Sequence, residues 1–128
     1  MNWYKKANNT DMFARGYCSE FAIALHQITN WPIYVFEEIE KDEDENEEYG
    51  LLVHVAVKTP DNRFADIRGI RTEQEISSHL LDSNLNQLTN YRITPYTQQN
   101  LEAEQDIDQE LVSMATDYIL KHKKAYLL

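Results

Sequence analysis

Three residues with the side chains of a nucleophilic triad follow one another along this chain: Cys18, His54 and Asp66. Cys18 is the single cysteine and stands two residues after Gly16. It directly precedes a run whose apolar residues recur at intervals of three and four, as one face of an amphipathic helix requires. A thiol at the start of a helix meets unpaired backbone N–H groups and the positive end of the helix dipole, which favour the thiolate. The position of Cys18 therefore indicates a reactive thiol.

His54 and Asp66 supply the groups that could activate this thiol. His54 interrupts an apolar run over residues 51–57, and Asp66 lies in a second short run over residues 64–67. A cysteine, a histidine and an acid are the set from which a base-activated nucleophile is assembled. The alternative interpretation is an unreactive cysteine that acts as a small buried hydrophobic residue, which is common for free cysteines.

The helix that carries Cys18 is predicted to end near Thr29 and Asn30. Pro32 cannot continue a helix, and it biases the residue before it towards an extended conformation. Residues 33–36 are β-branched and aromatic, which favours a strand. The thiol is thus expected at the far end of a helix from the point where the chain enters a sheet.

The runs that hold the histidine and the aspartate are predicted to be neighbouring antiparallel strands, over residues 51–57 and 63–67. The first is apolar at nearly every position, as in a central strand covered on both faces, and a turn signal separates the two. If the loop has an odd number of residues centred on Pro60, His54 and Asp66 stand directly opposite one another on the same face. A loop with an even number of residues would separate them.

The rest of the chain predicts two more helices and one more strand. The chain is expected to leave the sheet at residues 68–70, and the capping-box spacing at 72–75 predicts a helix that runs to about residue 81. Residues 91–94 predict a last strand, and an acidic start and a basic end predict a helix over about 101–123. The predicted fold class is α+β, with an antiparallel sheet of three to five strands packed against the Cys18 helix and closed by the long C-terminal helix.

The length of the chain predicts one domain over residues 1–128. Its composition predicts a cytoplasmic protein. A chain of this length can bury a sizeable core without staples. A single cysteine excludes a disulfide within the chain, which suits a reducing compartment. No run approaches the roughly 20 apolar residues that span a bilayer, so no membrane partner is expected.

The net charge of −10 is concentrated in one stretch, residues 37–48, which hold nine acids and one lysine. This acidic run predicts a long, solvated connection between two strands, because its carboxylates repel one another and Ile39 is its one apolar residue. The sequence has no basic stripe that could neutralise phosphates, so nucleic acid is not an expected partner.

The N-terminal segment and the glycine and histidine content carry weaker signals. Residues 1–15 predict one or two short helices beside the Cys18 helix, and residues 8–11 are either a polar turn or donors to an oxyanion hole. Three glycines cannot build a phosphate-binding loop or a dinucleotide fingerprint, and four scattered histidines with one cysteine offer no metal-ligand spacing. No cofactor and no metal are expected.

The order of these motifs resembles that of the papain-like cysteine superfamily, in particular its transglutaminase-like branch. The resemblance covers roughly residues 14–70. The matching positions are Gly16, Cys18, Phe21, Ala22 and Leu25, then His54 between two valines, and Asp66 within the run from Phe64 to Gly69. Ser19 follows the cysteine where many members have an aromatic residue, and no glutamine stands upstream as an oxyanion donor.

The resemblance implies acyl transfer on an amide, ester or thioester, with a protein or peptide as substrate. It assigns Cys18 as the nucleophile, His54 as the general base and then acid, and Asp66 as the group that orients the imidazole. A peptidase, a deamidase and a transglutaminase-like enzyme are all compatible with these roles. The alternative is a non-catalytic interaction module of the same fold, whose acidic loop at residues 37–48 engages a basic partner.

Overall fold

The computed structural model describes residues 17–44 and 46–128, and their fold is mixed α+β with one five-stranded antiparallel sheet. Residues 1–16, and with them Gly16 and the predicted N-terminal helices, lie outside the described part. In chain order the elements are α3 (Cys18–Thr29), β1 (Ile33–Lys41), β2 (Glu48–Lys58), β3 (Phe64–Asp66), β4 (Gly69–Arg71), α4 (Glu73–Ser77), β5 (Tyr91–Tyr96), α5 (Gln98–Glu104), α6 (Gln109–Lys121) and the 3-10 helix η1 (Lys123–Tyr126).

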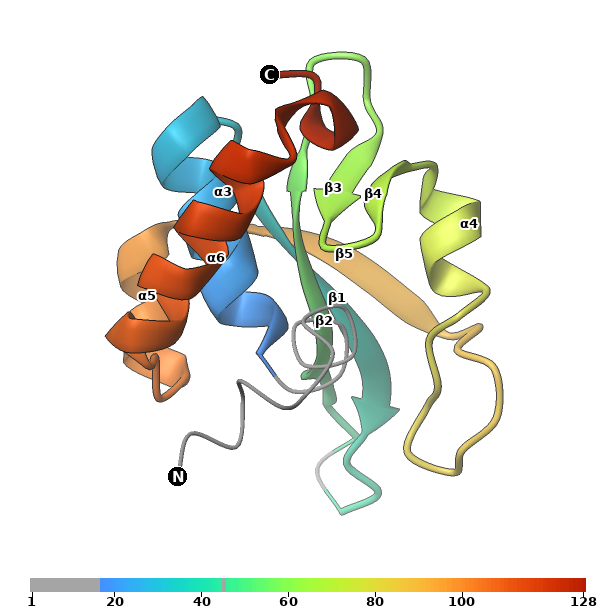
Figure 1. Cartoon of the computed structure of the whole chain (residues 1–128). Coiled ribbons are helices and arrows are strands. Elements are labelled where there is room, and N and C mark those ends of the chain that lie inside the picture. The colour runs from blue at the N-terminus through green and yellow to red at the C-terminus, as the bar shows by residue number, and fades with distance from the viewer. Residues whose placement is uncertain (1–16, 45) are drawn as a thin grey trace.

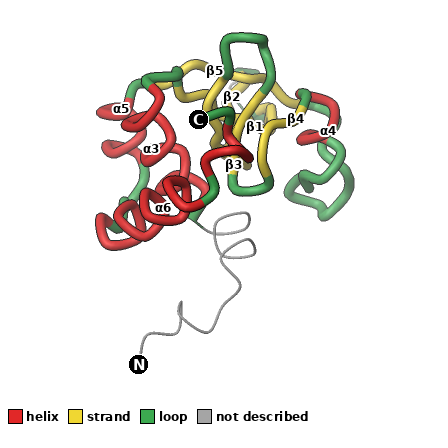
Figure 2. The backbone as a smooth tube through the Cα atoms, turned by 45° about the horizontal axis from the view of Figure 1, so that its top comes forward, coloured by secondary structure: helices red, strands yellow, loops and turns green. Residues whose placement is uncertain are grey.

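The sheet has the strand order β4-β3-β2-β1-β5, so β2 is its central strand. The helices α3, α5 and α6 lie on one side of it and the short α4 on the other (Figures 1 and 2). A large apolar cluster joins α3 and α6 to one face of the sheet, and a smaller one around Phe36, Phe64 and Ile76 fills the α4 side. The two faces of β2 therefore meet different layers.

The helix α3 forms where the sequence predicted it, from Cys18 to Thr29. Its apolar residues are buried against the sheet and α6, as the spacing required. Asn30 adopts a left-handed conformation, with φ of 62°, and its N–H donates to the carbonyl of His26. This C-cap and the following Pro32 end the helix before the chain enters β1.

The acidic run is not a single solvated connection, which corrects the prediction for residues 37–48. Strand β1 continues to Lys41 and β2 begins at Glu48, so the first acids belong to the sheet. Glu37 and Glu38 are buried, because each has donors: Arg92 Nε and Thr94 for Glu37, and the backbone N–H and hydroxyl of Ser83 for Glu38. A basic partner of this run would thus meet fewer free carboxylates than the sequence suggests.

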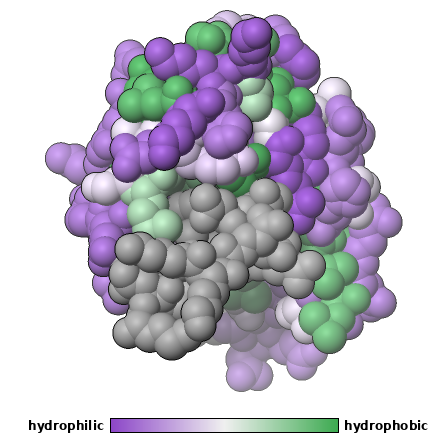
Figure 3. All heavy atoms as spheres, viewed as in Figure 1, coloured by the Kyte–Doolittle hydropathy of each residue, from purple (hydrophilic) through white to green (hydrophobic). Residues whose placement is uncertain are grey.

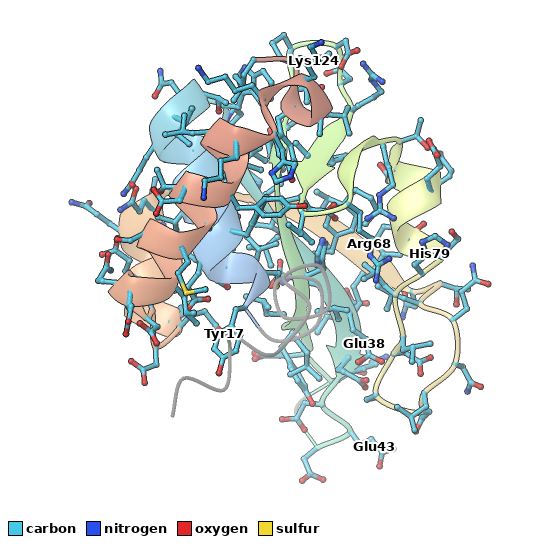
Figure 4. All side chains as sticks on the ribbon, viewed as in Figure 1. Tyr17, Glu38, Glu43, Arg68, His79 and Lys124 are labelled. Carbon is cyan, nitrogen blue, oxygen red and sulfur yellow. The ribbon has the colours of Figure 1, made fainter. Side chains whose placement is uncertain are left out.

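Figure 4 shows the contrast between two of these acids. Glu38 lies within the body of the protein, whereas Glu43 projects from the tip of the β1–β2 hairpin. Asp42 and Glu47 pair at the base of this tip, with the Asp42 N–H donating to the Glu47 carbonyl at 2.7 Å. Within the acidic run, Glu43 at the tip is therefore exposed, whereas Glu37 and Glu38 are buried in the sheet.

The chain does not leave the sheet after Asp66, which corrects a second prediction. It turns at once and returns as β4, with Asp66 paired to Gly69 and Phe64 paired to Arg71. Gly69 has φ of 101°, a conformation that glycine adopts without a steric penalty. The capping box of Thr72 and Glu75 is confirmed and starts α4, but that helix ends at Ser77.

The predicted helix over 101–123 is two helices. Helix α5 begins earlier, at Gln98, and ends at Glu104, and α6 begins at Gln109. The break occurs because Asp108 caps α6 with its side chain, accepting from the N–H of Glu110 at 3.0 Å, while its own N–H donates to the buried Glu20. The acidic residues that predicted the start of one long helix therefore lie partly in the junction between α5 and α6.

The face of the molecule seen in Figure 3 is mostly hydrophilic, with hydrophobic residues in small separate patches. Within the described residues no helix has the length and apolar content needed to cross a bilayer. The apolar side chains are instead concentrated on the two faces of the sheet.

Candidate active site

Cys18 is the first residue of α3 and is partly exposed. Tyr17 precedes the helix as its N-cap residue (Figure 4) and makes no side-chain capping hydrogen bond. The positive end of the α3 dipole lies at the residues that start the helix. The thiol therefore stands where the sequence predicted, at the electropositive end of a helix.

His54 lies on the central strand β2 and is almost fully buried, with 4% of its surface exposed. It pairs across the strands with Phe36, whose ring centroid is 6.0 Å from that of the imidazole. Its Nε2 lies 2.9 Å from Oδ2 of Asp66, which is equally buried. Of the two ring nitrogens, Nδ1 is therefore the one left for another partner.

The strand register places His54 and Asp66 differently from the prediction. Val57 pairs with Ala65, so the hairpin is centred on Asp61, and the extended register sets Asp66 beside the position two residues after His54. The displacement is an even number of residues, so both side chains still point to the same face. Diagonal neighbours on one face are close enough for long side chains to touch, which is how the 2.9 Å contact forms.

Asp66 receives hydrogen bonds from three neighbours, which hold its carboxylate in one orientation. Oδ2 accepts from His54 and from Nη2 of Arg71 at 2.8 Å, and Oδ1 accepts from the backbone N–H of Arg68 at 2.9 Å. Burial alone raises the pKa of Asp66, but the hydrogen bond from His54 and the charges of His54 and Arg71 lower it below its ordinary value. The aspartate is ionised and rigidly placed.

Arg71 is a site residue that the sequence prediction missed. Its guanidinium also lies 3.2 Å, through Nη1, from Nδ1 of His79 at the end of α4. Its place follows from the hairpin, because Arg71 pairs with Phe64 and so faces the same side as Asp66. The sequence signal for Arg71 lies in residues 66–69, which can close a tight hairpin around Gly69. The sequence prediction instead has the chain leave the sheet at residues 68–70.

Cys18 also lies close enough to His54 to affect the pKa of the imidazole. Burial lowers the pKa of His54, but its contacts with Asp66, which accepts the hydrogen bond from Nε2, and with Cys18 outweigh burial and raise the pKa to about 9. A protonated imidazole held between a carboxylate and a thiol is the arrangement that stabilises a thiolate. The structure thus brings together all three residues that the sequence singled out.

We expect the His54 imidazole to titrate near pH 9 rather than near 6.5, as followed by NMR of its ring resonances. Cys18→Ser and Asp66→Asn should each lower that midpoint, because each removes a group that favours the charged ring. Since the folded-state pKa is raised, the contribution of His54 to stability is complete below pH 6.5 and is lost as the pH rises through about 9. A midpoint near 6.5 in the native protein would contradict this assignment.

Among residues 17–44 and 46–128, no three histidine, cysteine or acidic side chains are grouped so as to hold a metal ion. Comparisons of the chain with protein families, with curated proteins and with solved structures found no match. The function is therefore argued from the geometry of Cys18, His54 and Asp66.

Proposed function

We propose that this protein is a cysteine-dependent hydrolase or acyltransferase. In this assignment Cys18 is the nucleophile, His54 is the general base and then acid, and Asp66 orients the imidazole. The observation that carries the proposal is the state of His54: Nε2 is held 2.9 Å from the buried carboxylate of Asp66, and Cys18 lies close enough to the ring to help raise its pKa. A nucleophile beside a base that is itself oriented by a third group is the geometry of triad catalysis.

The reaction would proceed through an acyl-enzyme. The Cys18 thiolate attacks the carbonyl carbon of the substrate, a C–S bond forms, and the carbonyl oxygen becomes an oxyanion near the start of α3, where backbone N–H groups can stabilise it. Protonated His54 gives its proton to the leaving amine, alcohol or thiol as that bond breaks. His54 then removes a proton from water or from an acceptor nucleophile, which displaces the acyl group from sulfur.

The arrangement of elements supports the papain-like or transglutaminase-like character of the proposal. A helix that begins at the cysteine is followed by an antiparallel sheet that carries the histidine and then the aspartate. Protein or peptide substrates are part of this proposal. A reducing compartment such as the cytoplasm suits it, because the chemistry requires a free thiol.

The test is acylation by an activated ester. We expect p-nitrophenyl acetate to release a burst of p-nitrophenol at pH 7 and to leave one acetyl group on Cys18, detectable by intact mass and peptide mapping. Cys18→Ser should abolish both signals, and His54→Gln should slow the burst by about tenfold or more, because the imidazolium that favours the thiolate is lost. His122→Gln, a histidine bonded to Tyr118 on the C-terminal helix, is the matched control and should behave as the native protein. A burst that persists in His54→Gln at the native rate would refute the proposal.

A further inference from the structure

A cavity of about 340 Å³ adjoins two of the three candidate residues, His54 and Asp66. Its polar wall is formed by the side chains of His54, Asp66, Arg68, Arg71 and His79. Cys18 is not among the described residues that line it. Its volume is near the lower end of the range of about 300–1,000 Å³ for small-ligand sites.

The cavity wall is positively charged, although the chain as a whole is strongly acidic. The single carboxylate in the wall is that of Asp66, and its two oxygens already accept hydrogen bonds from His54, Arg68 and Arg71. The guanidinium groups of Arg68 and Arg71 and the protonated His54 outnumber it. Figure 4 shows Arg68 and His79 on the same side of the sheet, beside α4. A negatively charged ligand would therefore find a favourable potential here.

Arg71 supplies a more specific signal. Its Nε is buried and has no hydrogen-bond partner within the described part of the chain, although its Nη1 and Nη2 are bonded to His79 and Asp66. A buried donor without an acceptor costs free energy, so such a group needs an explanation. Because an arginine nitrogen can only donate, Nδ1 of His79 is the acceptor in their contact, and its Nε2 carries the hydrogen. Among the described residues that line the cavity, Arg71 therefore has one buried donor, Nε, that lacks an acceptor.

The other lining residues of the cavity are apolar, and they favour an anion that has a hydrocarbon part. This apolar wall is formed by Ile76 of α4 and by Leu80 and Leu81, which follow that helix. Leu81 is 54% exposed, so its side chain is accessible to a ligand. A bare inorganic anion would leave this wall unused, whereas a carboxylate with a short hydrocarbon chain would cover it.

We propose that this cavity binds a small organic carboxylate, which accepts hydrogen bonds from Arg71 Nε and the Arg68 guanidinium and packs its hydrocarbon part on Ile76, Leu80 and Leu81. The inference goes beyond the proposed function, because such a ligand would bind whether or not the thiol reacts. A carboxylate and a guanidinium match each other in charge and planar geometry.

The experiment is an NMR titration of the full chain carrying Cys18→Ser, so that the result does not depend on acyl transfer. Sodium butyrate is the probe, n-butylamine is the control of opposite charge, and inorganic phosphate is the control without a hydrocarbon part. We expect saturable shifts of the amide resonances of Arg68, Arg71 and Ile76 with butyrate, and none with butylamine.

Two substitutions test the donors. Arg68→Gln keeps the backbone N–H that Asp66 uses and should weaken butyrate binding by about tenfold. Arg71→Lys keeps a positive charge beside Asp66 but has no Nε–H, and it should weaken binding at least as much. Arg63→Gln, an arginine of the β2–β3 turn that pairs with Asp61, should bind as the parent does.

The proposal would be overturned by the absence of saturable butyrate shifts, by equal binding of butylamine, or by unchanged affinity in Arg68→Gln. Phosphate binding more tightly than butyrate would overturn the assignment to a carboxylate. Arg68→Gln keeps the test decisive if Arg71→Lys fails to fold, because the Arg68 side chain is exposed and its backbone contact is retained.

Discussion

His54→Gln is expected to slow alkylation of Cys18 by iodoacetamide at pH 6 by at least about tenfold, and to have a much smaller effect at pH 9. An unassisted thiol, with an ordinary pKa of about 8.5, is less than about 1% ionised at pH 6. In the native protein the imidazole, whose pKa is raised to about 9, keeps its positive charge beside the sulfur and favours the thiolate. At pH 9 an unassisted thiol ionises by itself, so the benefit of His54 disappears.

Two further variants make this comparison specific. Asp66→Asn should slow alkylation at pH 6 by less than His54→Gln does, because it weakens the charged form of the imidazole without removing the ring. His122→Gln should leave the rate unchanged. The measurement is the second-order rate constant at each pH, from the loss of free thiol under native conditions. A native protein that is alkylated at pH 6 as fast as His54→Gln would exclude the thiolate–imidazolium pair.

The second large effect concerns folding. Asp66→Ala is expected to lower the free energy of unfolding at neutral pH by about 3–5 kcal/mol, the usual cost of removing one partner of a buried charged pair. The substitution leaves Nη2 of Arg71, Nε2 of His54 and the N–H of Arg68 without their acceptor in a region where the aspartate side chain is 5% exposed. Urea denaturation followed by circular dichroism measures the change.

An acid in the neighbouring turn provides the control. Asp61 also pairs with an arginine, Arg63, but its side chain is 53% exposed, so Asp61→Ala should change stability very little. The native protein should also lose the Asp66 contribution as the pH falls from about 3.8 through the lowered pKa of that group, because the carboxylate stabilises the fold only while ionised. Equal stability of Asp66→Ala and Asp61→Ala would contradict the structural role of Asp66.

Stability and the proposed chemistry depend on the same short hairpin. Its turn places the N–H of Arg68 on one carboxylate oxygen, and its second strand brings Arg71 to the other. The aspartate therefore comes to His54 already oriented, and the imidazole does not need to order it. Arg71 acts as a positioning residue, because it donates to Oδ2 of Asp66, the same oxygen that His54 contacts.

The predictions that the structure confirms rest on interactions between residues close in the sequence. The bounds of α3 follow from apolar spacing, from the proline that follows it and from the left-handed Asn30. The capping box at Thr72 is a hydrogen-bonding pattern within four residues and was predicted for the same reason. Such signals are complete in a short window, so tertiary contacts modify them little.

The errors occur where a distant residue changes the local preference. Glu37 and Glu38 have the composition of a solvated loop, but donors 45–57 residues away pair with them and keep them in the sheet. The C-terminal helix is interrupted where Glu20, 88 residues earlier, accepts from the N–H of Asp108. A single-sequence pattern holds no record of these partners.

The sequence by itself singled out Cys18, His54 and Asp66 as candidate triad residues, and it predicted that Cys18 starts a helix and that His54 and Asp66 lie on antiparallel strands. It left open whether the side chains of His54 and Asp66 point to the same face. The tertiary structure decided the register, which makes Asp66 a diagonal neighbour of His54 instead of its direct partner. It also decided that Arg71 joins the pair and that a charged cavity lies beside it. The physical reason is that side-chain parity repeats every two residues along a strand, whereas the turn, the packing of both sheet faces and the pairing of buried charges select one register among those with the same parity.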